Sequence, residues 1–159
     1  MSAKVSTSKK PSDASFHSDR PPRPVFFLDR CLGRYVVAEA LRAAGEVVEL
    51  HPDHFPQESP DPIWLPEVGR RGWIVLTKDR SIKSNQIEIA SLMQANTFCF
   101  NLVSASLTGS EMAIAFVSAL PDMKQLILRK PRPLVANIST NGRVSILLQH
   151  DDLMQRFRQ

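Results

Sequence analysis

Short apolar runs alternate with helix-length amphipathic segments along most of this chain, and this alternation is the feature that most limits its fold. The runs at 25–28, 46–50, 73–77 and 97–103 are typical of strands that are covered on both faces. The segments at 33–45, 61–72, 85–95 and 106–120 carry apolar residues at helical spacing. This order predicts an α/β fold with a doubly wound, mainly parallel sheet.

The two ends of the chain depart from this pattern. Residues 1–23 are rich in Ser, Lys and Pro and bury too little apolar surface to offset the entropy of ordering, so we expect a disordered basic tail. The folded domain then covers 24–150, and residues 151–159 are polar enough to form a flexible C-terminus. Within the domain, Pro121 predicts the start of a separate short helix over 121–130. Asn141-Gly142 between two β-rich runs predicts a β-hairpin that adds an antiparallel edge to the sheet.

Composition limits the class of protein without defining its activity. A chain of 159 residues has room for one domain, and no apolar run reaches the roughly 18 residues that a membrane span needs. The first residues hold no apolar core of a secretory signal, and Cys31 and Cys99 lack metal-ligand spacing, which is typical of a reducing compartment. We therefore expect a cytoplasmic protein. The net charge of +4 favours polyanionic partners, although part of the excess lies in the tail.

Acidic residues follow two of the expected strands. Asp29 closes the run at 25–28, Asp79 comes just after the run at 73–77, and Asp61 begins the helix that leads back to that second strand. Ligands of an open parallel sheet bind beyond the carboxyl ends of its strands, where the winding reverses. If the two strands are neighbours, their backbones lie about 4.8 Å apart and the carboxylates can converge on one ion. Since Mg²⁺ and Mn²⁺ prefer oxygen ligands of this kind, the sequence predicts a metal site at this edge.

Each acid also has a purely structural interpretation. Asp61 could cap its helix, Asp29 could cap the helix that follows it, and Asp79 could form a turn. The functional interpretation therefore depends on the three acids meeting at one edge. The His-Pro-Asp-His segment at 51–54 could be a transition-metal cluster, but its proline breaks regular spacing, and surface histidines on a loop are the preferred interpretation. We expect Cys31 to be a small buried apolar group.

The segments around these acids resemble a known family. FFLD at 26–29, LGRYVVAEALRAAGEVVEL at 32–50 and DPIWLPEVGRRGWIVLTKD at 61–79 are similar to PIN-domain ribonucleases, including the VapC-type toxins of toxin–antitoxin systems. In those toxins an Asp closes the first strand, another Asp opens a helix, and a later strand ends in a TxD signature. The match covers roughly 25–103, is strongest over 61–79, and is closest to a compact PIN-like variety without the usual helical insertion.

The resemblance implies a three-layer PIN-like fold in which Asp29, Asp61 and Asp79 are the catalytic residues and the ligands of Mg²⁺ or Mn²⁺. Basic residues beside these acids are then expected to bind the phosphates of the substrate: Arg30, Lys78, Arg80 and Lys83. Asn85 and Glu88, at the start of the next helix, are expected to cap or orient the site. PIN enzymes carry a further acid, usually a Glu. The sequence leaves open whether Glu39 or Asp53 takes that place or whether the protein is inactive.

The resemblance implies a metal-dependent endoribonuclease, a hydrolase of RNA phosphodiesters that acts as the toxin of a toxin–antitoxin pair. Its expected partners are RNA, an antitoxin protein that covers the acidic edge, and a second copy of the chain in a homodimer, with no membrane. Two alternatives stay open. One is a non-catalytic PIN-like protein that binds nucleic acid or regulates, and the other is a metal-dependent DNA nuclease.

Overall fold

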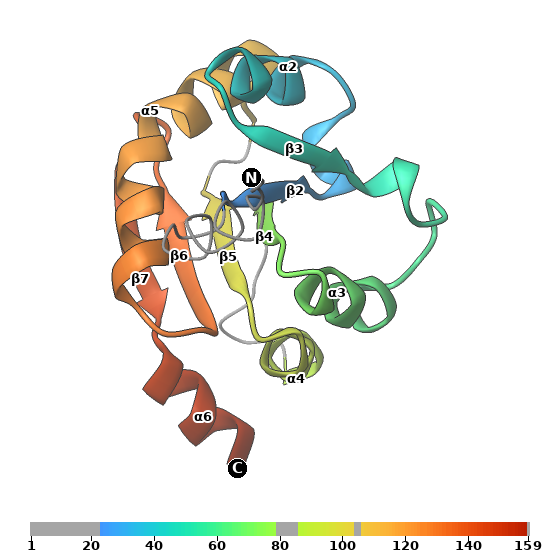
Figure 1. Cartoon of the computed structure of the whole chain (residues 1–159), viewed down its shortest axis with the longest axis vertical. Helices are drawn as coiled ribbons and strands as arrows, with labels where there is room; N and C mark the ends of the chain where they lie inside the picture. The colour runs from blue at the N-terminus through green and yellow to red at the C-terminus, as the bar shows by residue number, and fades with distance from the viewer. Residues whose placement is uncertain (1–22, 79–85, 104–105, 159) are drawn as a thin grey trace, which may run out of the picture.

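Six strands form one sheet in the computed structural model, which describes residues 23–78, 86–103 and 106–158 (Figure 1). The strands are β2 (Val25–Leu28), β3 (Val47–Leu50), β4 (Ile74–Lys78), β5 (Phe98–Leu102), β6 (Leu134–Ile138) and β7 (Val144–Leu148). The α-helices are α2 (Val36–Ala43), α3 (Asp61–Arg70), α4 (Gln86–Ala95), α5 (Gly109–Arg129) and α6 (His150–Arg158). Two short 3₁₀ helices, η2 (Arg30–Leu32) and η3 (His51–Asp53), follow the first two strands. The strand order is β3-β2-β4-β5-β6-β7.

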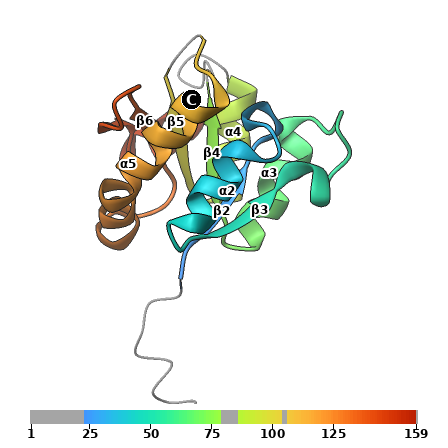
Figure 2. The same cartoon turned by 90° about the horizontal axis from the view of Figure 1, so that it is seen from above.

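Helices cover both faces of this sheet (Figure 1, Figure 2). Helices α2 and α5 pack over one face, where Phe26, Leu28 and Leu76 are buried. Helices α3, α4 and α6 pack over the other face, which includes Phe27 and Val75. Successive side chains of a strand point to opposite faces, so a central strand under helices on both sides must be apolar throughout. The predicted three-layer α/β fold with a mainly parallel sheet is confirmed.

The winding of the sheet reverses at β2. This strand pairs in parallel with β3 on one side and with β4 on the other, and β5 and β6 continue the parallel sheet beyond β4. The carboxyl ends of β2 and β4 are therefore adjacent, and the backbone N–H of Asp29 donates to the carbonyl oxygen of Leu76 at 3.0 Å. Loops that bind ligands gather at such a switch point in open α/β sheets. The condition for the two strand-end acids to approach each other, that β2 and β4 are neighbours, is therefore met.

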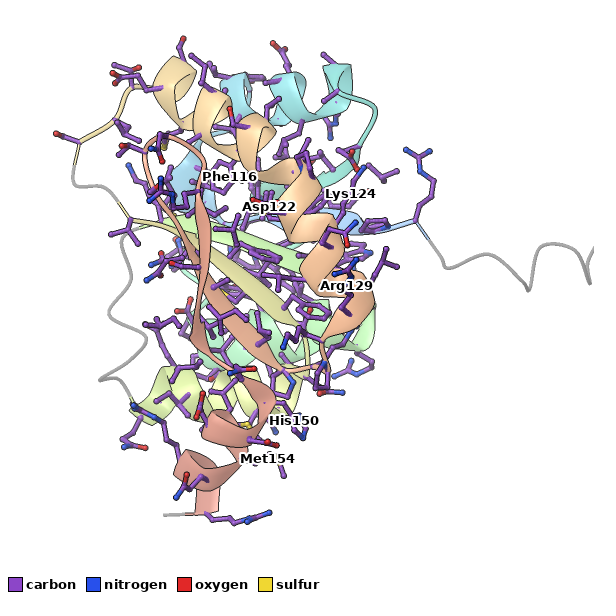
Figure 3. The ribbon with its side chains drawn as sticks, turned by 90° about the vertical axis from the view of Figure 1, so that its left-hand side faces the viewer. Phe116, Asp122, Lys124, Arg129, His150 and Met154 are labelled. Carbon is purple, nitrogen blue, oxygen red and sulfur yellow. The ribbon has the colours of Figure 1, made fainter. Side chains whose placement is uncertain are left out.

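A β-hairpin at the C-terminal end of the sheet joins β6 to the antiparallel strand β7 (Figure 3). In its turn, the N–H of Gly142 donates to the carbonyl oxygen of Ser139 at 2.9 Å, and the N–H of Ser139 donates to that of Arg143 at 2.9 Å. Gly142 has a φ of +85°, a conformation that glycine adopts without steric cost. The predicted hairpin and its antiparallel edge are confirmed.

Helix α5 is one continuous helix, so the prediction of a separate short helix over 121–130 is wrong. It begins with a capping box, in which Thr108 and Glu111 satisfy each other's backbone N–H groups. Pro121 lies inside the helix, and the buried side chains of Leu120 and Met123 flank it. Burial of a continuous apolar stripe against the sheet outweighs the backbone hydrogen bond that proline cannot make.

The C-terminal segment also differs from its prediction, because residues 150–158 form α6 where a flexible end over 151–159 was expected. Leu153 is 0% exposed and belongs to the core between the sheet, α3 and α4. Asp152 accepts a hydrogen bond from the backbone N–H of Gln149 at 2.9 Å, which supports the start of the helix. One buried leucine and one local hydrogen bond are too small a signal in a polar sequence to predict a docked helix.

The predicted disordered tail over 1–23 lies outside the described residues, except for Arg23. In the part of the chain that the structure describes, no helix is long and apolar enough to cross a membrane.

Close packing of α3 on α4 depends on Gly69. A Cβ added to this glycine would lie 1.9 Å from the carbonyl oxygen of Ala95, a backbone atom of α4. We expect Gly69→Ala to lower the free energy of unfolding by about 1–3 kcal/mol, although alanine is the better helix former. Urea denaturation measures this loss. Gly109→Ala is the control, since the atom nearest to its Cβ would be in the Val36 side chain, at 3.3 Å, and not in the backbone. Equal stability of the two variants would contradict the proposed backbone clash.

Candidate active site

Asp29 occupies the switch point between β2 and β4. Its side chain is 2% exposed, and its carboxylate oxygen Oδ2 accepts a hydrogen bond of 2.9 Å from the hydroxyl group of Thr77. Although Asp29 is the N-cap residue of η2, its side chain makes no capping hydrogen bond. The purely structural interpretation of Asp29 as a helix cap is therefore not supported. The residue is a buried carboxylate oriented by the neighbouring strand.

A small cavity lies between this carboxylate and helices α3 and α4. Its volume is about 10 Å³, the space of roughly one water molecule. It is lined by Asp29, Trp64, Leu65, Val75, Thr77, Glu88, Leu92 and Cys99. Glu88, in the first turn of α4, is half-buried and is the second acidic residue that lines this cavity. The expected position of Glu88 beside the site agrees with this arrangement.

Asp61 is the first residue of α3 and is half-buried. The N-cap of that helix is Pro60, so the helix starts one residue earlier than the capping interpretation of Asp61 requires. Trp64, one turn further along α3, lines the cavity together with Asp29. Helix α3 therefore contributes to the cavity beside Asp29, while the metal-ligand role of Asp61 stays a prediction.

The third predicted acid, Asp79, lies outside the described residues, as do Arg80, Lys83 and Asn85. Lys78, the residue before Asp79, ends β4 and is half-buried. Within 23–78, 86–103 and 106–158, no three His, Cys, Asp or Glu side chains form a group that could hold a metal ion. The three-acid metal site stays a prediction, because its central strand-end acid is one of the residues that the structure does not describe.

A row of polar side chains crosses the sheet next to Asp29, and sequence reasoning missed it. Thr77, Asn101 and Asn137 are aligned in register on β4, β5 and β6, and the Asn101 amide donates to the Asn137 side-chain oxygen at 3.3 Å. Thr77 and Asn101 are both buried. The sequence did contain a signal for this row, since Thr77, Asn101 and Asn137 each occupy the fourth position of a five-residue strand. Only the register shows that the three lie side by side.

Arg30 is held by contacts within the protein. Its Nη1 atom lies 3.1 Å from Nε2 of His51 and donates to the carbonyl oxygen of Ser59 at 3.1 Å. His51 is 0% exposed, so the prediction that it is a surface histidine is wrong. Burial lowers the pKa of His51, and the Arg30 charge lowers it further, while Asp29 acts in the opposite direction. The ring is buried because the apolar rings of β2 and α3 close over η3 once the chain folds.

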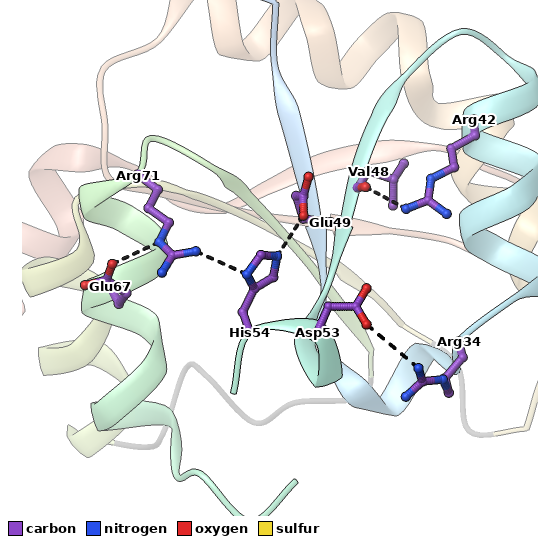
Figure 4. Close-up of polar contacts among 8 residues, drawn as sticks. All are labelled: Arg34, Arg42, Val48, Glu49, Asp53, His54, Glu67 and Arg71. Carbon is purple, nitrogen blue, oxygen red and sulfur yellow. Dashed lines mark hydrogen bonds and ion pairs between the residues drawn. The ribbon is translucent and has the colours of Figure 1, made fainter. Parts of the chain in front are cut away.

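The residues left open for a fourth acidic position lie away from the cavity. Glu39 is exposed on α2. Asp53 is exposed, and its Oδ1 atom pairs with Nη2 of Arg34 at 3.8 Å (Figure 4). Of the acids in the described residues, Glu88 rather than either of these shares the cavity with Asp29. The expectation that Cys31 is buried is also wrong, since Cys31 is exposed, although its sulfur lies 3.5 Å from the hydroxyl of Thr77.

His54 and its neighbours form a separate polar cluster that joins β3 to α3 (Figure 4). Its imidazole contacts Glu49 at 2.7 Å and Arg71 at 3.3 Å, and Arg71 donates to Glu67 at 2.9 Å. The hydrogen bond from Arg71 lowers the pKa of Glu67. The Arg71 guanidinium also lies 4.9 Å from the ring centre of Trp73. These contacts satisfy one another, so the cluster supports the loop before α3 and does not supply metal ligands.

Comparison with known proteins agrees with this fold. The family model for the PIN-like domain matches residues 24–104, about half of the chain, and the chain belongs to the PIN-like domain family. A curated relative from Mycobacterium tuberculosis (strain ATCC 25618 / H37Rv), "Putative ribonuclease VapC45", is 25% identical over 125 residues, which cover 76% of this chain and 90% of the relative. The resemblance to PIN-like, VapC-type proteins that the sequence indicates is thereby confirmed. No solved structure matches the chain.

Proposed function

We propose that this protein is a divalent-metal-dependent endoribonuclease, the toxin of a toxin–antitoxin pair, that hydrolyses RNA phosphodiesters in the cytoplasm. The observation that supports it best is the buried carboxylate of Asp29, at the switch point of a PIN-like sheet. The name of the mycobacterial relative supports the choice of RNA as substrate.

The side chains around the cavity suit a hard cation. Three of the residues that line it, Asp29, Thr77 and Glu88, carry side-chain oxygen atoms, and Mg²⁺ and Mn²⁺ prefer oxygen ligands. The nearby His51 is buried, with its Nε2 atom against Arg30, so it does not extend the set to a His-rich zinc site. The ligands in this proposal are Asp29, Asp61 and Asp79, with Glu88 as the fourth acid.

In the proposed mechanism, the side chains at this edge have different roles. When bound, a divalent ion activates water for in-line attack and offsets negative charge on the phosphodiester. The Thr77 hydroxyl holds the orientation of the Asp29 carboxylate. Lys78, at the end of β4, places a positive charge beside the acidic edge, where it can hold a phosphate without reading the base sequence. Arg80 and Lys83 are assigned the same task.

A nuclease assay tests the proposal. Purified protein is incubated with labelled RNA or labelled single-stranded DNA, with either Mn²⁺ or EDTA. We expect RNA fragments with Mn²⁺ and intact RNA with EDTA. Binding of RNA without cleavage would favour the non-catalytic alternative, and cleavage of DNA alone would favour the DNA nuclease.

As a toxin, the protein requires an antitoxin that covers the acidic edge.

We also propose a homodimer, formed through the opposite side of the sheet. Strand β7 ends the sheet there, and among the described residues no side chain donates to or accepts from its backbone. At the other edge, Arg42 donates to the carbonyl oxygen of Val48 on β3. An uncovered edge strand is a site for pairing with another chain.

A groove of about 470 Å³ lies between β7 and the C-terminal half of α5. Figure 3 labels Asp122 and Arg129 on this helix. It is lined by Asp122, Gln125, Leu126, Arg129, Lys130, Val144 and Ile146. Asp122 and Arg129 are two helical turns, about 10 Å, apart, and neither forms an ion pair within the described part of the chain. A two-fold axis between them places Asp122 of one copy opposite Arg129 of the other. The groove is therefore self-complementary in charge, as an isologous dimer requires.

Charge reversal tests the homodimer. We expect Asp122→Arg and Arg129→Asp to weaken the dimer by about tenfold or more each, because each places like charges opposite one another. The double variant is expected to restore dimerisation. Sedimentation equilibrium at low salt measures the dissociation constant, and Leu128→Lys, an exposed α5 position outside the groove, is the control. A wild-type protein that stays monomeric, or a double variant no better than the single ones, contradicts this interface.

A further inference from the structure

His51 is a buried histidine whose position is not explained by packing alone. It is 0% exposed, and its ring lies against the rings of Phe27, Phe55 and Trp64, with centroids 5.4–6.1 Å away. Its Nδ1 atom is buried and has no hydrogen-bond partner among the described residues. A buried polar atom of this kind costs stability, so an apolar side chain would fill the same space at a lower cost. The contribution of His51 must therefore come from its other nitrogen.

The other nitrogen, Nε2, holds Arg30. A guanidinium group has only donors, so at 3.1 Å the unprotonated Nε2 accepts from Nη1 of Arg30 and the ring proton lies on Nδ1. The same Nη1 atom donates to the carbonyl oxygen of Ser59 at 3.1 Å. One NH₂ group thus bridges His51 in η3 and the backbone of the loop before α3. Burial and the Arg30 charge both keep the imidazole neutral, which is the form that can accept this hydrogen bond.

This bridge connects the chain beside two of the proposed ligands. Arg30 directly follows Asp29, and Ser59 precedes Asp61 by two residues, a reach of at most about 7 Å. Packing of Trp64 on Phe27 places α3 against β2. The Arg30 bridge adds a direct polar contact between the residue after Asp29 and the loop just before Asp61.

We infer that His51 and Arg30 are positioning residues that hold the Asp61 segment against the end of β2, so that Asp29 and Asp61 are arranged for a divalent ion before it binds. This inference rests on the proposed metal-dependent function. The sequence predicts that Arg30 binds a substrate phosphate, whereas this inference assigns Arg30 to the organisation of the metal site. His51 acts through Arg30 and touches neither the ion nor the RNA.

Affinity for Mn²⁺ alone, measured by titration calorimetry without RNA, tests the inference. We expect His51→Leu to weaken Mn²⁺ binding by about 10- to 100-fold, the range found for groups that orient metal ligands. His51→Gln, whose amide oxygen can accept from Arg30, is expected to stay within about threefold of wild type. Thermal unfolding in EDTA provides the second readout. His51→Leu should melt close to wild type, because loss of the hydrogen bond from Arg30 is offset by removal of a buried nitrogen without a partner.

A second pair of variants covers the case in which His51→Leu does not fold. Arg30→Met is expected to cause the same loss of Mn²⁺ affinity, and Arg34→Met, a nearby exposed arginine that pairs with Asp53, should cause none. If wild type binds Mn²⁺ and the His51→Leu and Arg30→Met variants bind it equally well, the inference is overturned while the proposed function stands. If wild type and Asp29→Asn show the same lack of Mn²⁺ binding, the metal-dependent function is overturned and the inference with it.

Discussion

Asp29→Asn is expected to reduce metal-dependent RNA cleavage by on the order of 10³-fold or more, equivalent to about 4 kcal/mol of transition-state stabilisation. The exchange removes one negative charge from a side chain that is 2% exposed, where solvent screens charge poorly. The asparagine oxygen can still accept the hydrogen bond from Thr77, so the local geometry is retained. The loss then reports on charge at the metal site and not on folding.

The measurement compares initial rates of RNA cleavage at saturating Mn²⁺ with thermal unfolding in EDTA. Asp151→Asn, the same chemical change at an exposed position of α6, is the control and should cleave at the wild-type rate. Full cleavage by Asp29→Asn would show that the buried carboxylate is structural. A large fall in melting temperature together with the loss of activity would point to the same conclusion.

Phe27→Ala is expected to lower the free energy of unfolding by about 3–5 kcal/mol, the usual cost of deleting a fully buried phenylalanine. Phe27 is 0% exposed on β2, facing α3. Its ring lies 5.3–6.1 Å from the ring centres of His51, Phe55, Trp64 and Trp73. Truncation therefore leaves a cavity between strand and helix that these large, constrained rings cannot fill.

Chemical denaturation monitored by tryptophan fluorescence measures this effect, since Trp64 and Trp73 are the two tryptophans of the chain and both lie in the cluster. Phe27→Leu keeps most of the apolar volume and should cost less than half as much. Equal stability of the alanine and leucine variants would show that the rings around Phe27 rearrange to fill the cavity, which contradicts the prediction.

Much of the fold could be predicted because its signals are local. Apolar runs of strand length between helical stripes require a sheet with both faces covered, and Asn141-Gly142 specifies its hairpin by backbone preference alone. Pro121 and the polar C-terminal segment misled the prediction, because their local preferences are weaker than the burial of Met123 and Leu153 against the core. Tertiary packing decides such cases.

The candidate site divides in the same way. The sequence by itself determined that Asp29 ends a strand and Asp61 begins a helix, because the position of an acid within an element follows from the local pattern. Only the tertiary structure decided that Asp29 accepts a hydrogen bond from Thr77 and lines a cavity together with Glu88. It also decided that Arg30 joins the buried His51 to the loop before Asp61. These contacts join residues that are 21–59 positions apart in the chain. Strand order and register set such contacts, and no local preference of the chain encodes them.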